Sequence, residues 1–145
     1  MRADAHQVFR RYLDAVGLNG VALATAAGLN TTDWFALSVL EQAGPLTSGA
    51  LAERTGLTTG ATTRLIDRLE RLGHARRVAD PADRRRVLVE HVPNLDIDAI
   101  TGPARRHLGA LLQQYTPEQI ELLFDFFEKA APALQAATAE IRRKT

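Results

Sequence analysis

The apolar residues of the chain recur at helical spacing almost throughout, and the clearest part is a pair of helices separated by a glycine. Thr47 is a good N-cap for a first helix that places Ala50 and Leu51 inward and ends at Gly56. A second helix follows, capped by Thr58 and terminated by Gly73. Its apolar positions are spaced by four, four and three residues, with one further apolar residue beside them: Ala61, Leu65, Leu69 and Leu72, and Ile66.

The outward face of the second helix has the composition of a surface that contacts nucleic acid. A short helix, a turn with glycine and a longer helix form the helix-turn-helix arrangement, in which the second helix enters the major groove. Small and hydroxylated residues near its start permit close approach to base edges, and the arginines that follow can pair with guanine or phosphate. An ordinary amphipathic surface helix is the alternative, although it would more often have mixed Glu/Lys pairs. The residues of this face are Thr59, Gly60, Thr63, Arg64, Asp67, Arg68 and Arg71.

An arginine-rich loop comes after this helix. The turn-forming pair Asp80–Pro81 opens it, three consecutive arginines at 84–86 follow, and the apolar run Val87–Val89 completes it. This order predicts a β-hairpin with a cationic tip. Neighbouring guanidinium groups repel one another, but they are favourable against phosphates or in a narrow groove. A solvated surface hairpin is the alternative, and the helix pair that precedes the loop favours the nucleic-acid interpretation.

The whole arrangement resembles the winged helix-turn-helix of the MarR family of bacterial transcription regulators, from about Thr31 to Val89. The most specific parts are the segment Thr63–Glu70 and the Asp-x-Arg of the loop. In that family the second arginine after the loop aspartate enters the minor groove, and the aspartate orients it; these positions are Arg85 and Asp83 here. The recognition helix maps onto residues 58–72. The predicted DNA-binding residues are Ser48, Thr58, Thr59, Gly60, Thr63, Arg64, Arg68, Arg77, Asp83, Arg84, Arg85 and Arg86.

Two features depart from the family pattern. After the hairpin, the family usually continues with Leu-Thr and a glycine, whereas this chain has the segment His91–Asp96. In addition, Gly17 and Gly20 weaken the long first helix that the family implies, so one long or broken helix is expected over about residues 5–27. A helix capped by Thr31 or Thr32 is predicted next.

The C-terminal third of the chain is predicted to be helical. One helix covers about residues 97–114, with an interruption expected at Gly102–Pro103. The segment Thr116–Gln119 has the composition of a helix start, with a capping Thr, a Pro at the first position and a Gln at the third. The apolar stripe of this last helix continues past Pro132.

The terminal helices hold more apolar surface than one small DNA-binding lobe can bury. We therefore expect a two-fold dimer in which N- and C-terminal helices of two chains interlock, as the resemblance also implies. Packing within one chain is the alternative. The predicted fold class is mainly α with a small β-hairpin wing, divided into a winged helix-turn-helix lobe (31–92) and a helical dimerisation lobe (1–30 and 93–145). The predicted dimer-interface residues are Phe9, Leu13, Leu123, Phe124 and Phe127.

The charge of the chain is small overall but unevenly placed. The net charge is +1, yet residues 54–86 contain nine arginines against four acids, so the rest of the chain is acidic. An acidic body with a basic face is an electrostatic footprint of a DNA-binding protein. The abundance of Arg and Ala also suggests a GC-rich genome, which would account for some of these arginines.

Several other classes of function find little support in the sequence. Cysteine is absent, which excludes disulfides, thiolate metal sites and thiol-based redox sensing. The four histidines have no ligand-like spacing, no nucleophile–base constellation is visible, and neither a metal nor another cofactor is expected. No apolar run has the length of a membrane span and the N-terminus lacks the core of a signal peptide, so cytoplasmic residence is expected.

The sequence therefore predicts a sequence-specific transcriptional regulator and not an enzyme. Its expected partners are double-stranded DNA with a near-palindromic site, a second copy of the chain and a small aromatic or anionic effector, whose binding residues are unknown. By the resemblance, a ligand-responsive repressor is the expected type. The alternative is a winged-helix module that docks protein without sequence-specific DNA binding.

Overall fold

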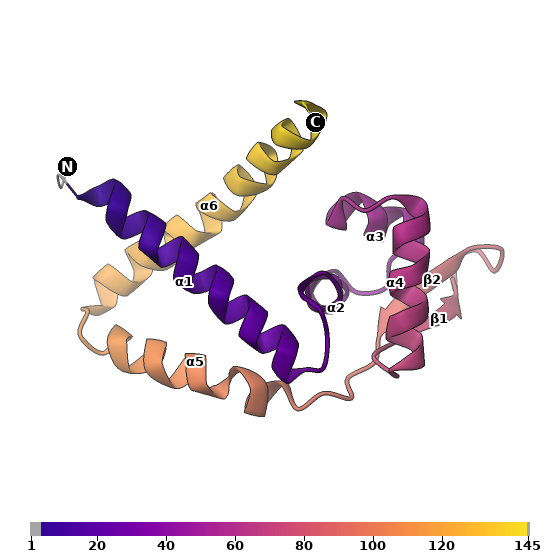
Figure 1. The fold of residues 1–145 in the computed structure, drawn as a ribbon, viewed down its shortest axis with the longest axis horizontal. Helices are drawn as coiled ribbons and strands as arrows, with labels where there is room; N and C mark the ends of the chain where they lie inside the picture. The colour runs from indigo at the N-terminus through magenta and orange to yellow at the C-terminus, as the bar shows by residue number, and fades with distance from the viewer. Residues whose placement is uncertain (1–3, 145) are drawn as a thin grey trace. The chain divides into compact units, whose positions relative to one another are not determined.

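The computed structural model describes residues 4–144, which form six helices and one antiparallel hairpin (Figure 1). This confirms the predicted fold class, mainly helical with a β-hairpin wing. The described residues divide by their contacts into two units, 4–102 and 103–144. The elements are α1 (Ala5–Ala26), α2 (Thr31–Ala43), α3 (Ser48–Thr55), α4 (Thr59–Arg71), β1 (Ala75–Ala79), β2 (Val87–His91), α5 (Ile97–Leu112) and α6 (Pro117–Lys144).

Side-chain caps define the starts of the central helices. The hydroxyl of Thr47 accepts the N–H of Ala50 at 3.1 Å, and the hydroxyl of Thr58 accepts the N–H of Ala61 at 3.2 Å, as predicted. The prediction for α2 was wrong. Thr31 and Thr32 already lie within that helix, and its N-cap is Asn30, whose side-chain oxygen accepts the N–H of Asp33 at 2.8 Å.

Helix α1 runs unbroken through Gly17 and Gly20, so neither glycine interrupts it. A glycine costs a helix interior roughly 0.5–1 kcal/mol relative to alanine, which packing of the helix can outweigh. The end of α1 is packed, because Ala24 is buried and the following Ala27 and Leu29 belong to the core. The chain then turns through Gly28, whose φ of 71° favours glycine.

Helix α5 includes Pro103, so the interruption predicted at Gly102–Pro103 does not end the helix. The boundary between the two contact units falls at this same dipeptide. Helix α6 begins with the predicted capping box, since Thr116 and Gln119 exchange hydrogen bonds of 2.9 and 3.3 Å between side chain and backbone. Helix α6 also continues past Pro132, as predicted.

The core of residues 4–102 lies between α2, α3, α4 and the hairpin. Leu40 of α2, Leu51 of α3, and Leu65 and Ile66 of α4 are almost fully buried. This confirms the stripe predicted for α4, except at its last position. Leu72 is half exposed, because α4 ends at Arg71 and the chain turns away through Gly73.

The hairpin is joined to the helices at its base. Strands β1 and β2 pair antiparallel, with Arg77 opposite Val89. Val89 also forms an isolated bridge with Leu46, in the connection between α2 and α3, through two backbone hydrogen bonds of 2.7 and 3.0 Å. The buried Val89 therefore ties the hairpin to the connection that precedes α3.

Among residues 4–144, no single helix has the length and apolar character needed to span a membrane. Helices α1 and α2 meet those criteria only when taken together, and they are bent by 89° relative to each other.

Candidate nucleic-acid interface

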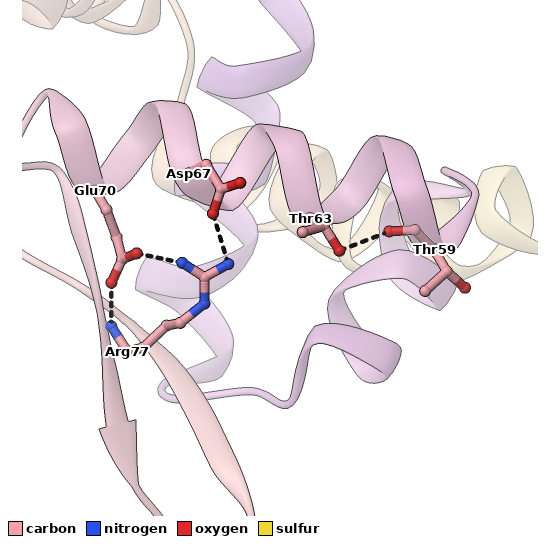
Figure 2. A network of polar contacts seen from close by, with 5 residues as sticks. All are labelled: Thr59, Thr63, Asp67, Glu70 and Arg77. Carbon is pink, nitrogen blue, oxygen red and sulfur yellow. Dashed lines mark hydrogen bonds and ion pairs between the residues drawn. The ribbon is translucent and has the colours of Figure 1, made fainter.

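Helix α4, the predicted recognition helix, presents small and hydroxylated residues at its start. The hydroxyl of Thr63 donates to the backbone carbonyl of Thr59 at 3.0 Å (Figure 2). Its proton is used within the helix, so towards an outside partner Thr63 offers an acceptor oxygen and a methyl group. The guanidinium of Arg64 lies back over Gly60, since a Cβ at Gly60 would come within 3.7 Å of Arg64 Nη1. Gly60 therefore leaves room for a cationic group near the helix start.

The turn after β1 forms the wing loop, residues 80–86, which projects from the end of the hairpin (Figure 1). Backbone hydrogen bonds of 2.9 Å, from Asp80 N–H to the Arg86 carbonyl and from Arg86 N–H to the Asp83 carbonyl, close the loop. The carboxylate of Asp83 accepts the backbone N–H of Arg85 at 3.0 Å. Asp83 was expected to orient the side chain of Arg85; the structure instead shows it fixing the backbone at that residue.

The arginines of residues 54–86 separate into two groups. Four have an acidic partner within the described residues: Arg68, Arg76, Arg77 and Arg86. The other five are exposed, and the described residues provide no hydrogen-bond or ion-pair partner for their side chains: Arg54, Arg64, Arg71, Arg84 and Arg85. The second group is available for an external anion. It includes the predicted contacts on the recognition helix and at the wing tip.

Arg68 belongs to the first group and has a structural role. Its Nε and Nη2 donate to the two carboxylate oxygens of Asp33, at 3.0 and 2.7 Å. The Asp33 side chain is only 3% exposed, whereas that of Arg68 is 40% exposed. The hydrogen bond to Asp33 raises the pKa of Arg68 above its ordinary value, although burial works in the opposite direction. Arg68 therefore ties α4 to α2, and its predicted DNA contact stays a prediction.

Arg77 is also held within the protein. Its Nη2 donates to Asp67 Oδ1 at 2.8 Å, its Nη1 donates to Glu70, and its backbone N–H donates to the other Glu70 oxygen at 2.8 Å (Figure 2). Burial lowers the pKa of Arg77, but the hydrogen bonds and charges of Asp67 and Glu70 outweigh this effect and raise it overall. The guanidinium donors of Arg77 thus face two carboxylates, and its DNA contact stays a prediction.

The remaining predicted contacts lie at the exposed starts of the two helices. Ser48 is the first residue of α3 and is exposed. Thr58 is exposed too, although its hydroxyl oxygen already accepts the cap hydrogen bond of α4. Ser48 therefore lies at the start of α3, whereas Thr58, Thr59, Gly60 and Thr63 lie at the start of α4 with Arg64.

The segment that departs from the family pattern packs against the end of the recognition helix. His74, which follows α4, is buried and its Nδ1 shares a hydrogen bond with the side-chain oxygen of Asn94. The Asn94 amide nitrogen lies 3.4 Å from the Leu72 carbonyl. His74 therefore belongs to the packing. Within residues 4–144, no group of three or more His, Cys, Asp or Glu residues is placed to hold a metal ion.

Sequence reasoning missed Asp33. An acid in the first turn of a helix usually serves the helix dipole, and its sequence position does not reveal a partner 35 residues later. The available signal was that Asp33 lies among the apolar positions of α2, where an acid needs a cation.

A helix-turn-helix whose second helix lies beside an arginine-tipped hairpin defines a winged helix-turn-helix regulator. A family model described as "MarR family" matches residues 27–86. An uncharacterized HTH-type transcriptional regulator of Bacillus subtilis, YcgE, is 37% identical over 145 residues, covering 99% of this chain and 94% of YcgE. The chain belongs to the MarR family of transcriptional regulators. It is therefore a regulator and not an enzyme, and DNA is its partner.

Other proteins agree with this assignment. A second uncharacterized HTH-type transcriptional regulator of B. subtilis, YsmB, is 28% identical over 144 residues, covering 98% of this chain and 94% of YsmB. The fold is similar to the solved structure of a MarR family protein from Bacillus stearothermophilus, with a TM-score of 0.73 and 24% identity over 92% of this chain and 94% of that one. It is also similar to RV1404 from Mycobacterium tuberculosis, with a TM-score of 0.66 and 20% identity over 90% and 97% of the two chains.

Replacing Arg68 by methionine should destabilise the protein, because Asp33 would remain buried without its partner. Breaking a buried ion pair costs about 3–5 kcal/mol, and we expect the lower end because Arg68 is partly exposed. Urea unfolding followed by circular dichroism measures the change. Arg71→Met is the matched control, since Arg71 is exposed on the same helix, and it should change the free energy of unfolding by less than about 0.5 kcal/mol. Equal losses for both variants would contradict the structural role of Arg68.

Proposed function

We propose that the protein is a dimeric, ligand-responsive repressor that binds a near-palindromic DNA site. The observation that carries this proposal is the placement of exposed arginines without internal partners on two separate elements. Arg64 lies on the recognition helix, and Arg84 and Arg85 lie at the tip of the wing loop. One element suits the major groove and the other the adjacent minor groove or backbone.

The recognition helix reads bases in this proposal. Gly60 lets the helix start approach closely, and Arg64 reaches over it with a fork of donors that matches the O6 and N7 acceptors of guanine. Thr63 offers an acceptor and a methyl group, which suit an exocyclic amino group or a thymine methyl. Ser48, Thr58 and Thr59 would contact the DNA backbone beside this site.

The wing supplies affinity that depends on the shape and charge of the duplex. Arg84 and Arg85 share one exposed tip, where their mutual repulsion falls when phosphates surround them. Asp83 and Asp80 fix the loop backbone by accepting the N–H groups of Arg85 and Ala82, so the tip is ordered before DNA binds. This order reduces the entropy lost on binding. Arg86 Nε lies 3.8 Å from Asp80 Oδ2, so this arginine is less available for a DNA contact than Arg84 and Arg85.

The terminal helices support a dimer. Phe9 and Leu13 of α1 are about half exposed, at 50% and 43%. Helix α6 contains no buried residue, and the ring of Phe127 makes edge-to-face contacts with those of Phe124 and Phe126 while all three remain exposed. Exposed apolar surface on this scale is typical of an interface. Leu123, Phe124 and Phe127 would pack against a second copy.

An effector could bind in the open hollow between α1 and α2, which measures about 280 Å³. Gly17 and Gly20 on one side face Trp34 and Phe35 on the other, and a flat aromatic molecule suits such walls. Such an effector would bind more tightly to a form of the dimer in which the spacing of the recognition helices does not fit DNA. The ratio of its affinities for this form and for the DNA-binding form would set how far DNA binding is weakened. Release of DNA would then relieve repression.

Arg85→Ala should weaken binding to the preferred DNA site at least tenfold without unfolding the protein. The side chain is exposed and makes no internal contact, so its removal affects only the external partner. Fluorescence anisotropy at fixed salt, after a selection of genomic fragments, measures the affinity. Binding that stays at the wild-type level would remove the wing from the proposal.

Arg64→Ala should relax base preference more than it lowers overall affinity. A bidentate pair with guanine contributes about 1–3 kcal/mol of discrimination against other bases. The measurement compares affinities for the selected site, for the site with single guanines replaced, and for random duplex. An equal loss on all three would show that Arg64 contacts only phosphate.

The protein should sediment as a dimer at micromolar concentration, because the apolar face of α6 needs a partner. Phe124→Glu together with Phe127→Glu should shift it to monomer and lower DNA affinity, since one module binds weakly. Gln135→Glu is a control on the same helix, because Gln135 is exposed and the substitution adds a negative charge outside the aromatic cluster. A wild-type monomer would contradict the proposed interface.

A further inference from the structure

We propose that Arg77 controls DNA affinity without contacting DNA, by neutralising and holding two carboxylates of the recognition helix. This inference rests on the proposed function, because it assigns a positioning residue to the same DNA-binding surface. The set of residues Arg77, Asp67 and Glu70 is called the acidic clamp below.

The geometry of the acidic clamp uses the forked shape of the guanidinium. One terminal nitrogen of Arg77 donates to Asp67 at 2.8 Å and the other donates to Glu70, while the backbone N–H of Arg77 donates to the second Glu70 oxygen at 2.8 Å. Figure 2 shows the guanidinium between the two carboxylates of α4. A lysine has a single ammonium group and cannot reproduce this fork.

The carboxylates lie where they would oppose DNA binding if left alone. Asp67 is 52% exposed and follows Arg64 by three residues, so both share one side of α4. Glu70 is one turn further on. Without Arg77, two negative charges would stand beside the arginine that reads bases, and they would repel phosphates. With Arg77 in place, the local charge is −1 instead of −2.

The acidic clamp also fixes the wing relative to the recognition helix. Arg77 lies on β1, on the strand that leads into the wing loop, and the carboxylates lie on α4. Three hydrogen bonds across this junction hold the start of the wing to one turn of the helix. The distance between Arg64 and the wing-tip arginines is thereby restricted. A duplex that both must contact is bound best when that distance is set in advance.

The alternative is that Arg77 leaves the carboxylates and binds a phosphate. The two explanations differ in the salt dependence of binding. If Arg77 acts through Asp67 and Glu70, their neutralisation restores part of the binding to a protein that lacks Arg77, and the salt slope stays at the wild-type value. If Arg77 contacts phosphate, every variant that lacks Arg77 loses about one released ion from its salt dependence, with or without the carboxylates.

The experiment uses the full chain, a duplex selected from genomic fragments by the wild-type protein, and a random duplex. It compares Arg77→Met, Arg77→Lys, and Arg77→Met combined with Asp67→Asn and Glu70→Gln. Arg76→Met is the matched control, because Arg76 precedes Arg77 on β1 and pairs with Glu90 across the hairpin and not with α4. Circular dichroism and urea unfolding establish that each variant is folded.

We expect Arg77→Met to bind the selected duplex at least tenfold more weakly than Arg76→Met, with Arg77→Lys in between. The triple variant should recover only part of the lost affinity, because it removes the two exposed negative charges but does not restore the hydrogen bonds between β1 and α4, and its salt slope should equal that of wild type. If the triple variant binds as weakly as Arg77→Met, or if Arg77→Met binds like Arg76→Met, the inference is overturned. Failure of the wild-type protein to bind any duplex would instead overturn the proposed function, and the inference with it.

Discussion

The contact between Arg68 and the buried carboxylate of Asp33 is the interaction on which the position of the recognition helix depends. Apolar side chains such as Leu65 and Ile66 hold α4 against the core, but apolar contacts alone allow a helix to slide or rotate. A bidentate pair between a carboxylate and a guanidinium has a defined direction. Because Asp33 is almost fully buried, any rotation of α4 that breaks the pair leaves a charge without a partner.

This constraint explains how one residue type serves two purposes on the same surface. Arg68 pairs with a buried carboxylate of α2, and Arg77 pairs with two partly exposed carboxylates of α4. Arg64, Arg84 and Arg85 have no such partner among the described residues and remain available for DNA. The difference lies in the acidic residues nearby and not in the arginines. Counting arginines therefore overstates the part of the surface that can neutralise phosphates.

Much of the fold follows from local patterns that the sequence displays. The caps at Thr47 and Thr58, the glycine at 56 and the stripe of α4 depend on residues a few positions apart, and all were predicted correctly except Leu72 at the end of the stripe. The N-cap of α2 was misplaced because Asn30, Thr31 and Thr32 all suit that position. The continuity of α1 through Gly17 and Gly20 depends on packing, which outweighs propensity.

The long-range pairs could not be predicted in the same way. Asp33 and Arg68 are separated by 35 residues, and nothing in their local sequence links them. The same holds for Arg77, which resembles any other arginine of the basic segment until its carboxylates are known. The role of Asp83 was predicted in kind but not in detail, since its hydrogen bond reaches the backbone of Arg85.

The bridge between Leu46 and Val89 has a mechanical consequence. Its two backbone hydrogen bonds join the base of the hairpin to the chain that enters α3, so the wing is not an independent arm. Together with the ion pairs of Arg68 and Arg77, this bridge links α2, α4 and the wing to one another. In the proposed complex, the energy of adjustment to a curved or overwound duplex would therefore fall on the DNA, and sequences that deform easily between the contacted bases would be bound more tightly.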